Sequence, residues 1–496
     1  MADILAALGM VAEPFSLACL VFGVWVGIMF GAMPGLSVNM GLALLLPLAF
    51  AFKGIAGILM LLGIYCGAIY GGSISAILLK TPGTPASVAT TLDGYPLATK
   101  LHQPGRALGI STMASTFGGI FSTVCLVIMA PLLAKVALQF SKPEYFALAV
   151  FGLSIITSVS SGNVIKDVMG GLVGLFLATI GIDAMSGVIR FTFGTNYLLG
   201  GVSFIPILIG VFALAQVLQS IEDNWKYIHQ TTKMAIDRTL PRLSDIRRVF
   251  VTLLRSSVIG TFIGCIPGTG GDIASFVAYD QAKRWSRHKD NFGQGEPEGV
   301  AAPEAGNNAV SGGAFIPVLT LGIPGDGATA IMMGALMVQG IQPGPMLFLE
   351  KAPYVYAIFL GLFFANVAMC LMGYSLIRLF AKVTQVPTVI LLPLILVMTF
   401  VGTYSYNNSM SDVFVMVGSG ILGYFLNKLE FSMSSLIIGI ILGAMAEQNF
   451  VGSLIMSDGS LSIFWTRPLC LFFLVAAVVM LLAPLFSFGK KKKKAA

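Results

Sequence analysis

The sequence predicts an all-α polytopic membrane protein with roughly 12–15 membrane segments, built as two inverted-topology repeats whose helices are broken or re-entrant at Pro-Gly pairs. Three observations predict this fold class. Hydrophobic residues make up 56% of the chain and charged residues only 10%, a balance that a soluble globular surface does not tolerate. Apolar stretches of membrane-spanning length recur along the chain. A motif of the form G-x-x-x-G-x-x-P-G occurs once in each half of the chain.

Hydropathy places candidate spans in both halves. In the first half they lie near residues 15–33, 38–52, 54–79, 106–133, 145–160, 164–182 and 199–218. In the second half they lie near 249–266, 270–283, 311–337, 352–377, 386–402, 411–427, 433–452 and 468–487. We therefore expect a first transmembrane repeat (1–218), a basic cytoplasmic linker (219–248), a second repeat (249–467) and an extra C-terminal span with a basic tail (468–496).

The basic residues indicate an orientation, because loops rich in Lys and Arg stay on the cytoplasmic side. With the C-terminal run Lys490–Lys494 inside, the other basic connections are also inside: Lys80–Arg106, Gln219–Arg248, Lys283–Lys289 and Arg378–Lys382. Only six basic residues then fall outside: Lys53, Lys135, Lys142, Arg190, Lys351 and Arg467. We expect a periplasmic N-terminus and a cytoplasmic C-terminus. The net charge of +7 follows from this topology and requires no nucleic-acid partner.

Two segments repeat in the same order. The stretch Gly27–Gly35 (GIMFGAMPG) matches Gly260–Gly268 (GTFIGCIPG) in a G-x-x-x-G-x-x-P-G frame. Further along, Pro82-Gly83 follows Gly71 at the spacing at which Pro324-Gly325 follows Gly313. The first motif ends the first expected span and its copy ends the eighth. An odd separation predicts opposite orientations, hence inverted repeats.

A Pro-Gly pair inside the membrane has a chemical consequence. Proline removes a helix donor and glycine accepts positive φ, so the pair ends one half-helix and can begin another. Each unpaired backbone group costs on the order of several kcal/mol in hydrocarbon, so such a break is tolerated where it lines a wet cavity or meets a ligand. Half-helix N-termini attract anions, and exposed carbonyls suit sodium. The alternative is that each pair is a simple loop between spans.

The motifs around these breaks resemble the TctA family, the large permease subunit of tripartite tricarboxylate transporters. They are Gly31–Leu36, Tyr70–Ser87, Leu92–Leu97, Pro267–Gly270, Glu298–Asn308, Leu321–Asp326 and Gln342–Pro345. The resemblance implies a permease of the bacterial inner membrane that moves small organic carboxylates, driven by a Na⁺ or H⁺ gradient. It also implies two partners, a small membrane subunit and a periplasmic substrate-binding protein.

Two positions depart from the pattern of the family that the chain resembles. Lys80 stands where the family has an amide, and the family's Ala-Asn-Asn is here Ala305-Gly306-Asn307-Asn308. The Lys80 ammonium can either add a cation near a carboxylate substrate or reach the cytoplasmic interface along its apolar stem, and we favour the second.

Candidate site residues flank the breaks. A carboxylate needs donors, and we expect contact from Ser73, Pro82, Gly83, Thr84, Ser87, Pro324, Gly325 and Thr329. For ion coupling we expect Asn39, Gly268, Thr269, Asp272, Asn307, Asn308 and Asp326, because an aspartate at membrane depth commonly serves an ion path and amide oxygens suit sodium. The hydroxyls can instead bond their own helix carbonyls, and the aspartates can cap helices or pair with a cation such as Arg255.

Three other carboxylates are interpreted as structural or solvated. Glu298 and Glu304 lie in a polar stretch before an expected span, where they either gate the cytoplasmic side or, as we favour, belong to a solvated loop. The sequence Asp93-Gly94-Tyr95-Pro96 is typical of a turn.

Competing functions are less well supported by the residues. The six cysteines stand singly, no C-x-x-C pair occurs, and the three histidines have no triad or zinc partners nearby in the sequence, so we expect no catalytic residue, no metal site and no cofactor. The lysine of an ATP-binding phosphate loop is missing from Pro267-Gly-Thr-Gly-Gly-Asp272. A channel, or a secondary transporter for another small solute, is the remaining alternative, and a membrane-embedded enzyme is less favoured.

Overall fold

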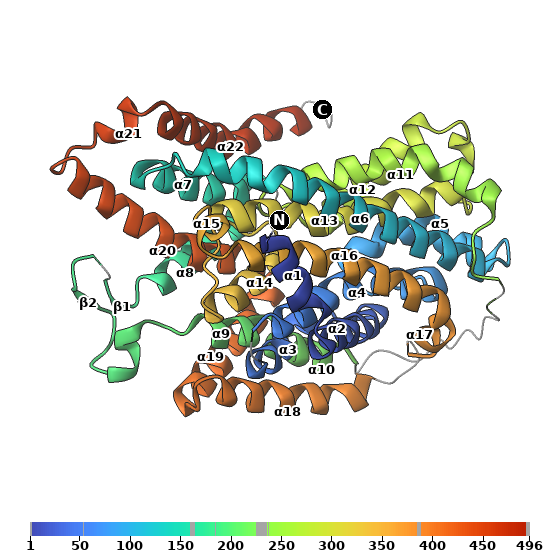
Figure 1. Cartoon of the computed structure of the whole chain (residues 1–496), viewed down its shortest axis with the longest axis horizontal. Helices are drawn as coiled ribbons and strands as arrows, with labels where there is room; N and C mark the ends of the chain where they lie inside the picture. Colours follow the sequence, from blue (N-terminus) through green and yellow to red (C-terminus); the bar gives the residue numbers. More distant parts are fainter. Residues whose placement is uncertain are drawn as a thin grey trace. The chain divides into compact units, whose positions relative to one another are not determined.

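The computed structural model describes residues 2–52, 54–158, 164–183, 185–224, 236, 238–383 and 388–492. Within them the chain is almost entirely helical, and the two strands, β1 (Gly181–Ile182) and β2 (Ile189–Arg190), form one short antiparallel pair (Figure 1). The all-α fold class is confirmed. Part of the predicted linker (225–235 and 237), His229 and the last lysines of the C-terminal run lie outside the described residues.

The chain forms two compact units, residues 1–134 with 216–406 and residues 135–215 with 407–496. Unit 1 contains α1 (Ala2–Ala12), α2 (Pro14–Ala32), α3 (Val38–Ala51), α4 (Ala56–Leu79), η1 (Pro85–Ser87), α5 (Val88–Thr99) and most of α6 (Pro104–Ala137). From the second half of the chain it contains α10 (Ala215–Asn224), α11 (Leu243–Gly264), α12 (Gly270–Trp285), η4 (Lys289–Asn291), α13 (Pro297–Leu321), α14 (Gly327–Val338), α15 (Leu347–Glu350), α16 (Ala352–Ser375), α17 (Ile377–Val383) and α18 (Thr388–Asn407).

Unit 2 combines α7 (Lys142–Ser158), α8 (Val164–Ala178), η2 (Asn196–Gly200), α9 (Phe204–Leu208) and η3 (Ile209–Leu214) with α19 (Met410–Lys428), α20 (Met433–Met456), α21 (Ile463–Thr466) and α22 (Pro468–Lys492). Helix α20 packs against both α7 and α8. Two buried carboxylates of unit 2 have hydrogen-bond partners. Glu144 of α7 accepts from Arg467 at 2.5 Å, and Asp412 of α19 accepts from Tyr197 at 2.5 Å. The expected repeat boundaries, 1–218 and 249–467, stay predictions.

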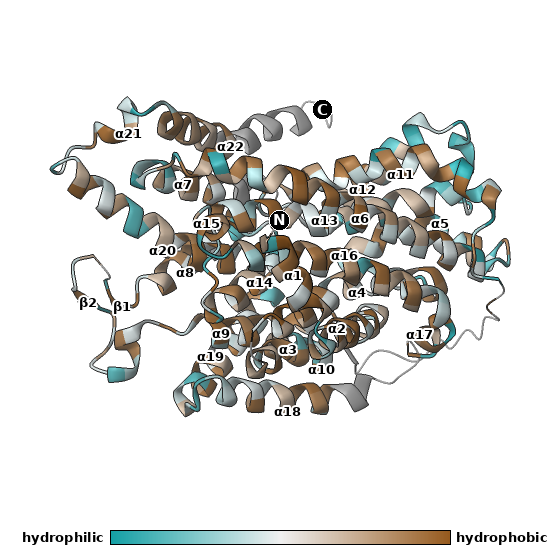
Figure 2. Cartoon of the chain, viewed as in Figure 1, coloured by the Kyte–Doolittle hydropathy of each residue, from teal (hydrophilic) through white to brown (hydrophobic). Residues whose placement is uncertain are grey.

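Seven helical segments of the described chain are long and apolar enough to cross a membrane. They are α2, α4, α6, the continuous stretch Phe204–Glu222, α16, α19 and α20. Figure 2 shows hydrophobic residues along most helices and more hydrophilic ones in the connections beside α11 and α12. A multi-pass membrane protein is therefore the fold that length and composition support.

The expected break at Pro324-Gly325 divides the candidate span 311–337 into two helices, since α13 begins at Pro297 and ends at Leu321, and α14 begins at Gly327. One sequence expectation about these elements is wrong. The predicted turn at Asp93-Gly94 lies inside α5. Asp93 is fully buried and accepts from the backbone N–H groups of Gly293, Gly295 and Glu296, so tertiary contacts supply the partners that a turn would otherwise provide.

Helices α4 and α13 form the centre of unit 1. The apolar window of α4 is entirely buried, and α13 is buried from Pro297 to Thr320. Each packs against the preceding long helix of its own half, α4 against α2 and α13 against α11, and the two contact each other through the rings of Tyr65 and Phe315, 6.1 Å apart.

Equivalent glycines let these helix pairs approach closely. A β-carbon on Gly27 would lie 2.5 Å from the carbonyl oxygen of Ile64, and one on Gly260 would lie 2.0 Å from that of Gly306. Two further contacts match in the same way: Gly31 against Ala68 with Gly264 against Val310, and Gly71 against Ile28 with Gly313 against Thr261. The pairs α2–α4 and α11–α13 therefore pack alike, and the sequence repeat is also a repeat of backbone contacts.

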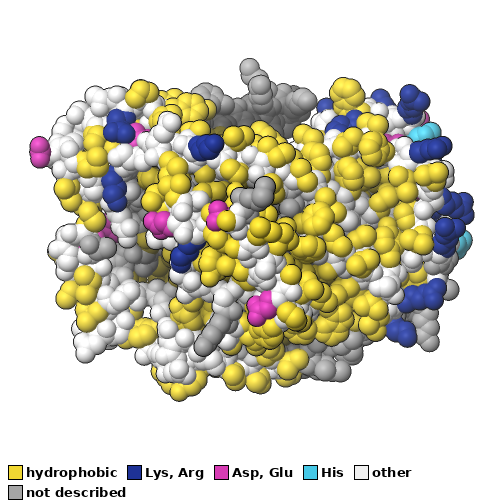
Figure 3. All heavy atoms as spheres, in the orientation of Figure 1, with side chains coloured by type: hydrophobic (Ala, Val, Ile, Leu, Met, Phe, Trp, Pro, Cys, Tyr) yellow, Lys and Arg dark blue, Asp and Glu magenta, His cyan; other side chains and the backbone are white. Residues whose placement is uncertain are grey.

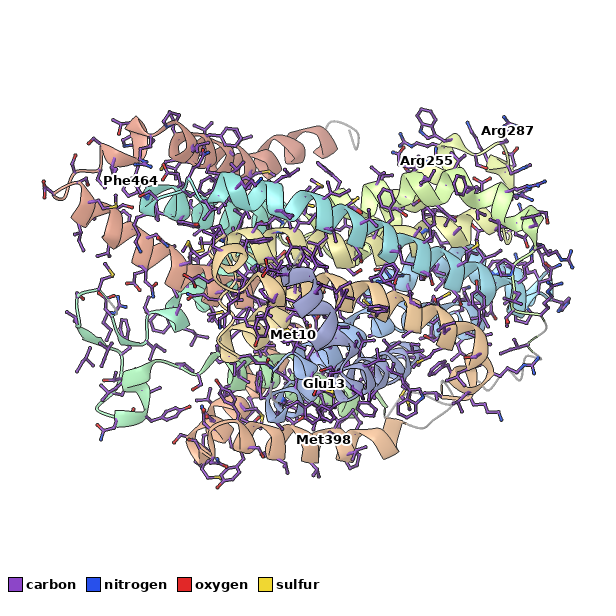
Figure 4. The ribbon with its side chains drawn as sticks, in the orientation of Figure 1. Met10, Glu13, Arg255, Arg287, Met398 and Phe464 are labelled. Carbon is purple, nitrogen blue, oxygen red and sulfur yellow. The ribbon has the colours of Figure 1, made fainter. Side chains whose placement is uncertain are left out.

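The basic residues of unit 1 gather at one end of it (Figure 3). Arg287 and Arg255, labelled in Figure 4, lie at this end. The four connections expected on one side of the membrane carry exposed basic side chains, namely Lys80, Lys100, Arg238, Arg242, Arg247, Arg248, Lys283, Arg284, Arg287, Lys289, Arg378 and Lys382. This grouping agrees with the order of spans expected from the sequence. The side of the membrane on which it lies stays a prediction.

Candidate functional site

The first break follows α4. Lys80 adopts a left-handed conformation (φ 58°), Pro82-Gly83 interrupts the helix, and η1 leads into α5. The N–H of Gly83 donates to the carbonyl oxygen of Gly72 at 3.3 Å, and the hydroxyls of Thr84 and Ser87 are hydrogen-bonded to each other at 2.6 Å. Both hydroxyls are buried. The break therefore folds back against its own helix and is not a loop in bulk water.

The second break has the same plan. Gly322 ends α13 in the left-handed region (φ 69°), Pro324-Gly325 follows, and Asp326 caps α14. The Asp326 carboxylate accepts from the backbone N–H of Thr329 at 2.8 Å and from its hydroxyl at 2.7 Å. The helix-cap alternative for Asp326 and Thr329 is thus what the structure shows, and it uses only one of the two carboxylate oxygens, Oδ1.

Three of the four breaks meet in unit 1. The N–H of Gly268, at the end of α11, donates to the carbonyl oxygen of Gly325 at 2.6 Å. The start of α12 packs against η1, and Ala86 lies beside Gly271, whose β-carbon would come within 3.4 Å of the Ala86 methyl. The break at 82–87 of the first half and the breaks at 267–271 and 324–326 of the second half are therefore neighbours.

Asn307 borders this junction from α13. Its amide oxygen would lie 2.1 Å from a β-carbon on Gly271, so the amide group stands against the N-terminal turn of α12. The side chain is 1% exposed, and its Nδ2 has no hydrogen-bond partner within the described residues. A buried donor without a partner costs roughly 1–3 kcal/mol, which makes this amide a candidate ligand-binding group.

Tyr65 makes the corresponding approach from α4. It lies six residues before Gly71, as Asn307 lies six residues before Gly313. Its hydroxyl donates to Asp326 Oδ2 at 3.3 Å. Each central helix thus presents a polar side chain to a break of the second half: α4 presents Tyr65 to Asp326, and α13 presents Asn307 to the first turn of α12, which packs against η1.

Asp272 adds a second carboxylate to this region. It lies in the first turn of α12, is partly buried, and is close enough to Asp326 for the two charges to interact. Arg255 does not neutralise them, because its guanidinium lies over the Trp285 ring at 5.9 Å (Figure 4 labels Arg255). Two acidic groups beside helix N-termini suit a site that takes a cation together with an anion.

The comparisons with known proteins decide the family. The family model of the tripartite tricarboxylate transporter TctA family matches residues 17–438. The chain belongs to this family. An uncharacterized 52.8 kDa protein in the TAR-I ttuC′ 3′ region of Agrobacterium vitis is 36% identical over 487 residues, covering 97% of this chain and 95% of the relative. An uncharacterized protein in the TAR-II ttuC′ 3′ region of the same bacterium is 36% identical over 234 residues, 47% of this chain and 97% of that protein. No solved structure matches.

Some predicted site residues of this TctA-family chain have structural partners instead. The Thr269 hydroxyl donates to the carbonyl oxygens of Ile263 and Ile266 at the end of α11. Asn308 Nδ2 donates to the carbonyl oxygen of Glu304 on its own helix at 3.0 Å. Asn39 is half-buried near the start of α3, and no hydrogen bond within the described residues joins its side chain to Asp272 or Asp326. Their role in ion coupling stays a prediction.

Lys80 does not enter the junction. Its side chain is exposed and its ammonium lies 5.8 Å from the centre of the Tyr95 ring. This position agrees with a cation held at the interface, the interpretation favoured from the sequence. Positive potential at the breaks of this TctA-family chain must therefore come from backbone N–H groups and the Asn307 amide.

The expectation that Glu298 and Glu304 lie in a solvated loop is wrong. Both lie on α13, and they are 7% and 0% exposed. Glu298 accepts from Thr252 at 3.0 Å and from Ser286 at 3.1 Å. The polar composition of this stretch suggested a loop, but its polar side chains face hydroxyls on neighbouring helices. Tyr65 was also missed, although its place in the repeat, equivalent to Asn307, was a signal that could have found it.

Proposed function

We propose that this chain is the permease subunit of a secondary transporter that carries small organic tricarboxylates or dicarboxylates across the bacterial inner membrane. An ion gradient, of Na⁺ or H⁺, drives the uptake. A periplasmic binding protein delivers the substrate, and a small membrane subunit completes the transporter. Family membership supports transport and partner subunits as a class, and the geometry of the breaks supports an anionic substrate.

The Asn307 amide is the observation on which the proposed substrate depends. Its buried Nδ2 has no partner in the described chain and stands beside the first turn of α12. Backbone N–H groups at a helix N-terminus attract anions, and the amide adds a directed donor. The hydroxyls of Thr84 and Ser87, bonded to each other, lie at the two ends of the short segment that packs against α12. A carboxylate placed here receives both kinds of donor, and a cation beside Asp272 and Asp326 would offset their repulsion.

Transport by the purified chain tests the proposal. The chain is reconstituted in liposomes, and uptake of labelled citrate, tartrate and succinate is measured under an inward sodium gradient and, separately, an inward proton gradient. The same assay is run with the binding protein added outside. We expect uptake of at least one of the three acids above that of protein-free liposomes under at least one gradient. No uptake of any of them, with or without the binding protein, would contradict the proposal.

A matched pair of variants assigns the site. Asn307→Ala removes the unpartnered amide and is expected to raise the substrate concentration needed for half-maximal uptake by about tenfold or more, equivalent to one lost hydrogen bond to a charged group. Asn449→Ala removes a half-buried asparagine of α20 whose amide donates to the carbonyl oxygen of Met445 on its own helix at 2.7 Å. The control should keep wild-type affinity. Equal effects of both variants would remove Asn307 from the substrate site.

A further inference from the structure

Glu304 is a fully buried carboxylate whose partners are all uncharged. It lies on α13 one turn before Asn307. Its Oε1 accepts from the Thr90 hydroxyl at 2.5 Å and its Oε2 from the Ser115 hydroxyl at 2.9 Å. The side chain is 0% exposed, and no Lys or Arg among the described residues forms an ion pair with it.

Two other buried carboxylates of the same unit, Asp245 and Glu296, are paired with arginines. Asp245 is paired with Arg106 at 2.5 Å and Glu296 with Arg248 at 2.7 Å. Such pairing fixes the charge, because removing an ionised group from water is costly unless a cation or many donors compensate. Two hydroxyls stabilise a carboxylate only in part, and they can equally receive a hydrogen bond from its protonated form. The surroundings of Glu304 therefore accommodate both the charged and the neutral state.

A chain of hydroxyls connects Glu304 to the helix that carries the first break. The Ser111 hydroxyl on α6 lies beside the Glu304 carboxylate and donates to the Ser73 hydroxyl at 2.7 Å. Ser73 in turn donates to the carbonyl oxygen of Tyr70 at 2.8 Å. The neighbour of Ser73 is Gly72, whose Cα lies against the hydroxyls of Thr84 and Ser87.

Ser111 has one hydrogen to donate, which makes this chain sensitive to the charge of Glu304. When Glu304 is ionised, its carboxylate competes with Ser73 for that hydrogen. When Glu304 is protonated, its own O–H can donate to Ser111, and Ser111 can then donate to Ser73. The hydrogen bonding of Ser73, next to the first break, thus depends on whether Glu304 carries a proton.

The other titratable groups on elements packed against α13 have partners of their own. On α4 the Tyr70 hydroxyl is bonded to Thr112 at 2.7 Å, and on α5 Asp93 accepts from Tyr279 of α12 at 2.8 Å. Charged groups on the remaining neighbours are Arg106 of α6 with Asp245, Arg248 of α11 with Glu296, Arg255 of α11 over Trp285, and Asp272 and Asp326 at the junction. Glu304 is fully buried, and its two carboxylate oxygens accept from hydroxyls of two other helices, Thr90 of α5 and Ser115 of α6.

We propose that Glu304 binds and releases the coupling proton during transport, and that Ser111 conveys its charge state to Ser73 beside the first break. This inference rests on the proposed function, because a coupling proton has meaning only in a carrier. It names one of the two coupling ions and assigns it to a residue outside the junction itself.

Glu304→Gln keeps the size of the side chain and its hydrogen bonding but cannot titrate. Glu298→Gln is the matched control, since it makes the same change two turns earlier on α13 at a carboxylate bonded to Thr252 and Ser286. Exchange of labelled for unlabelled citrate, tartrate or succinate is measured in liposomes at a series of pH values without a gradient. Accumulation is then measured under a pH gradient at equal sodium on both sides.

For the wild type and Glu298→Gln we expect exchange that varies with pH and accumulation driven by the pH gradient. For Glu304→Gln, whatever its maximal exchange rate, we expect no variation with pH and accumulation no higher than in protein-free liposomes. Accumulation of the labelled acid by Glu304→Gln under a pH gradient, above that in protein-free liposomes, would overturn the proposal. So would wild-type accumulation that follows a sodium gradient and ignores the pH gradient, a result that leaves the proposed transport function intact.

A second readout does not depend on transport. Infrared difference spectra between acidic and alkaline pH report a buried carboxyl group through the absorption of its protonated C=O bond. The wild type and Glu298→Gln should show a titrating band that Glu304→Gln lacks. If the wild type moves none of the three acids, the proposed function fails, and this band alone decides whether Glu304 is a proton-binding site. Identical spectra for wild type and Glu304→Gln would overturn it.

Discussion

Gly83 stands directly against the backbone of Gly31: a β-carbon on Gly83 would lie 1.8 Å from the carbonyl oxygen of Gly31. In the second repeat Gly325 has the equivalent relation to Gly264, at 2.9 Å. In each repeat, the glycine that follows the central helix (Gly83 after α4, Gly325 after α13) therefore contacts the helix that ends at the other Pro-Gly pair of the same repeat, α2 or α11. This contact closes the two breaks of each repeat onto each other.

Gly83→Ala is expected to destabilise the protein by about 1–3 kcal/mol or more, because the clash is with backbone and no side chain can move aside. Gly325→Ala should cost less, since the approach is less close: the nearest atoms are Ala314 Cβ at 2.7 Å and the carbonyl oxygen of Gly264 at 2.9 Å. Gly9→Ala is the control, with nothing within 4 Å of its added carbon. Thermal unfolding in detergent, followed by size-exclusion chromatography, should rank Gly83→Ala lowest, then Gly325→Ala, then Gly9→Ala. Wild-type stability of Gly83→Ala would contradict the contact.

Much of this architecture could be predicted from the sequence because its causes are local. Membrane spans follow from hydropathy, and the helix breaks follow from the missing donor of proline and the freedom of glycine. The recurring glycines also carried spatial information, since each marks a close approach of two helices. The order of Gly71 with Pro82-Gly83 and of Gly313 with Pro324-Gly325 therefore predicted two similar helix pairs, and the structure contains them.

The polar interior could not be predicted in the same way. The hydroxyls that bind Glu304 belong to Thr90 and Ser115, which are 214 and 189 residues away in the sequence. In the sequence alone, Glu304 is an acidic residue that follows two prolines and precedes two asparagines, a composition typical of a loop. Asp93 was misread for the same reason, because its three backbone donors lie some 200 residues downstream. Long-range partners decide both positions.

Asp326→Asn is expected to lower ion-coupled uptake strongly while leaving membrane insertion and stability close to wild type. Asparagine is as good a helix N-cap as aspartate, so α14 keeps its first turn, but the negative charge beside Asp272 is lost. Asp326→Ala should in addition cost about 1 kcal/mol of stability through the lost cap. Uptake in liposomes under sodium and proton gradients, with thermal stability measured in parallel, separates the two effects. Unchanged ion dependence of Asp326→Asn would exclude Asp326 from coupling.

The Arg106–Asp245 pair should make stability depend on pH. Burial acts to raise the pKa of Asp245, but the hydrogen bonds and charge of Arg106 outweigh it, so the pKa lies below its ordinary value of 3.8. The stabilisation from a lowered pKa is fully present above that ordinary value and is lost as the pH falls through the folded-state pKa. We expect unfolding temperature to fall below about pH 4.

Variants of this pair separate it from a surface contact. Arg106→Gln leaves the Asp245 carboxylate, 3% exposed, without its cation and should cost roughly 1–3 kcal/mol at neutral pH. Lys166→Gln is the control, because its partner Glu430 is 83% exposed and such pairs contribute little. Unfolding temperatures of both variants at pH 7 test this. A larger loss in Lys166→Gln than in Arg106→Gln would contradict the assigned roles.

The orientation of the chain can be tested at two exposed residues of unit 1. Ala2, exposed at the start of α1, is expected in the periplasm, and Arg287, exposed in the basic connection after α12, is expected in the cytoplasm (Figure 4). An impermeant thiol reagent applied to intact spheroplasts should label Ala2→Cys, and it should label Arg287→Cys only after the membrane is opened. The wild type measures labelling of the six native cysteines. The reverse pattern would mean that the whole chain has the opposite orientation in the membrane. Labelling of both residues from one side would mean that an even number of spans separates them, which would contradict the expected topology and with it the opposite orientation of the two repeats.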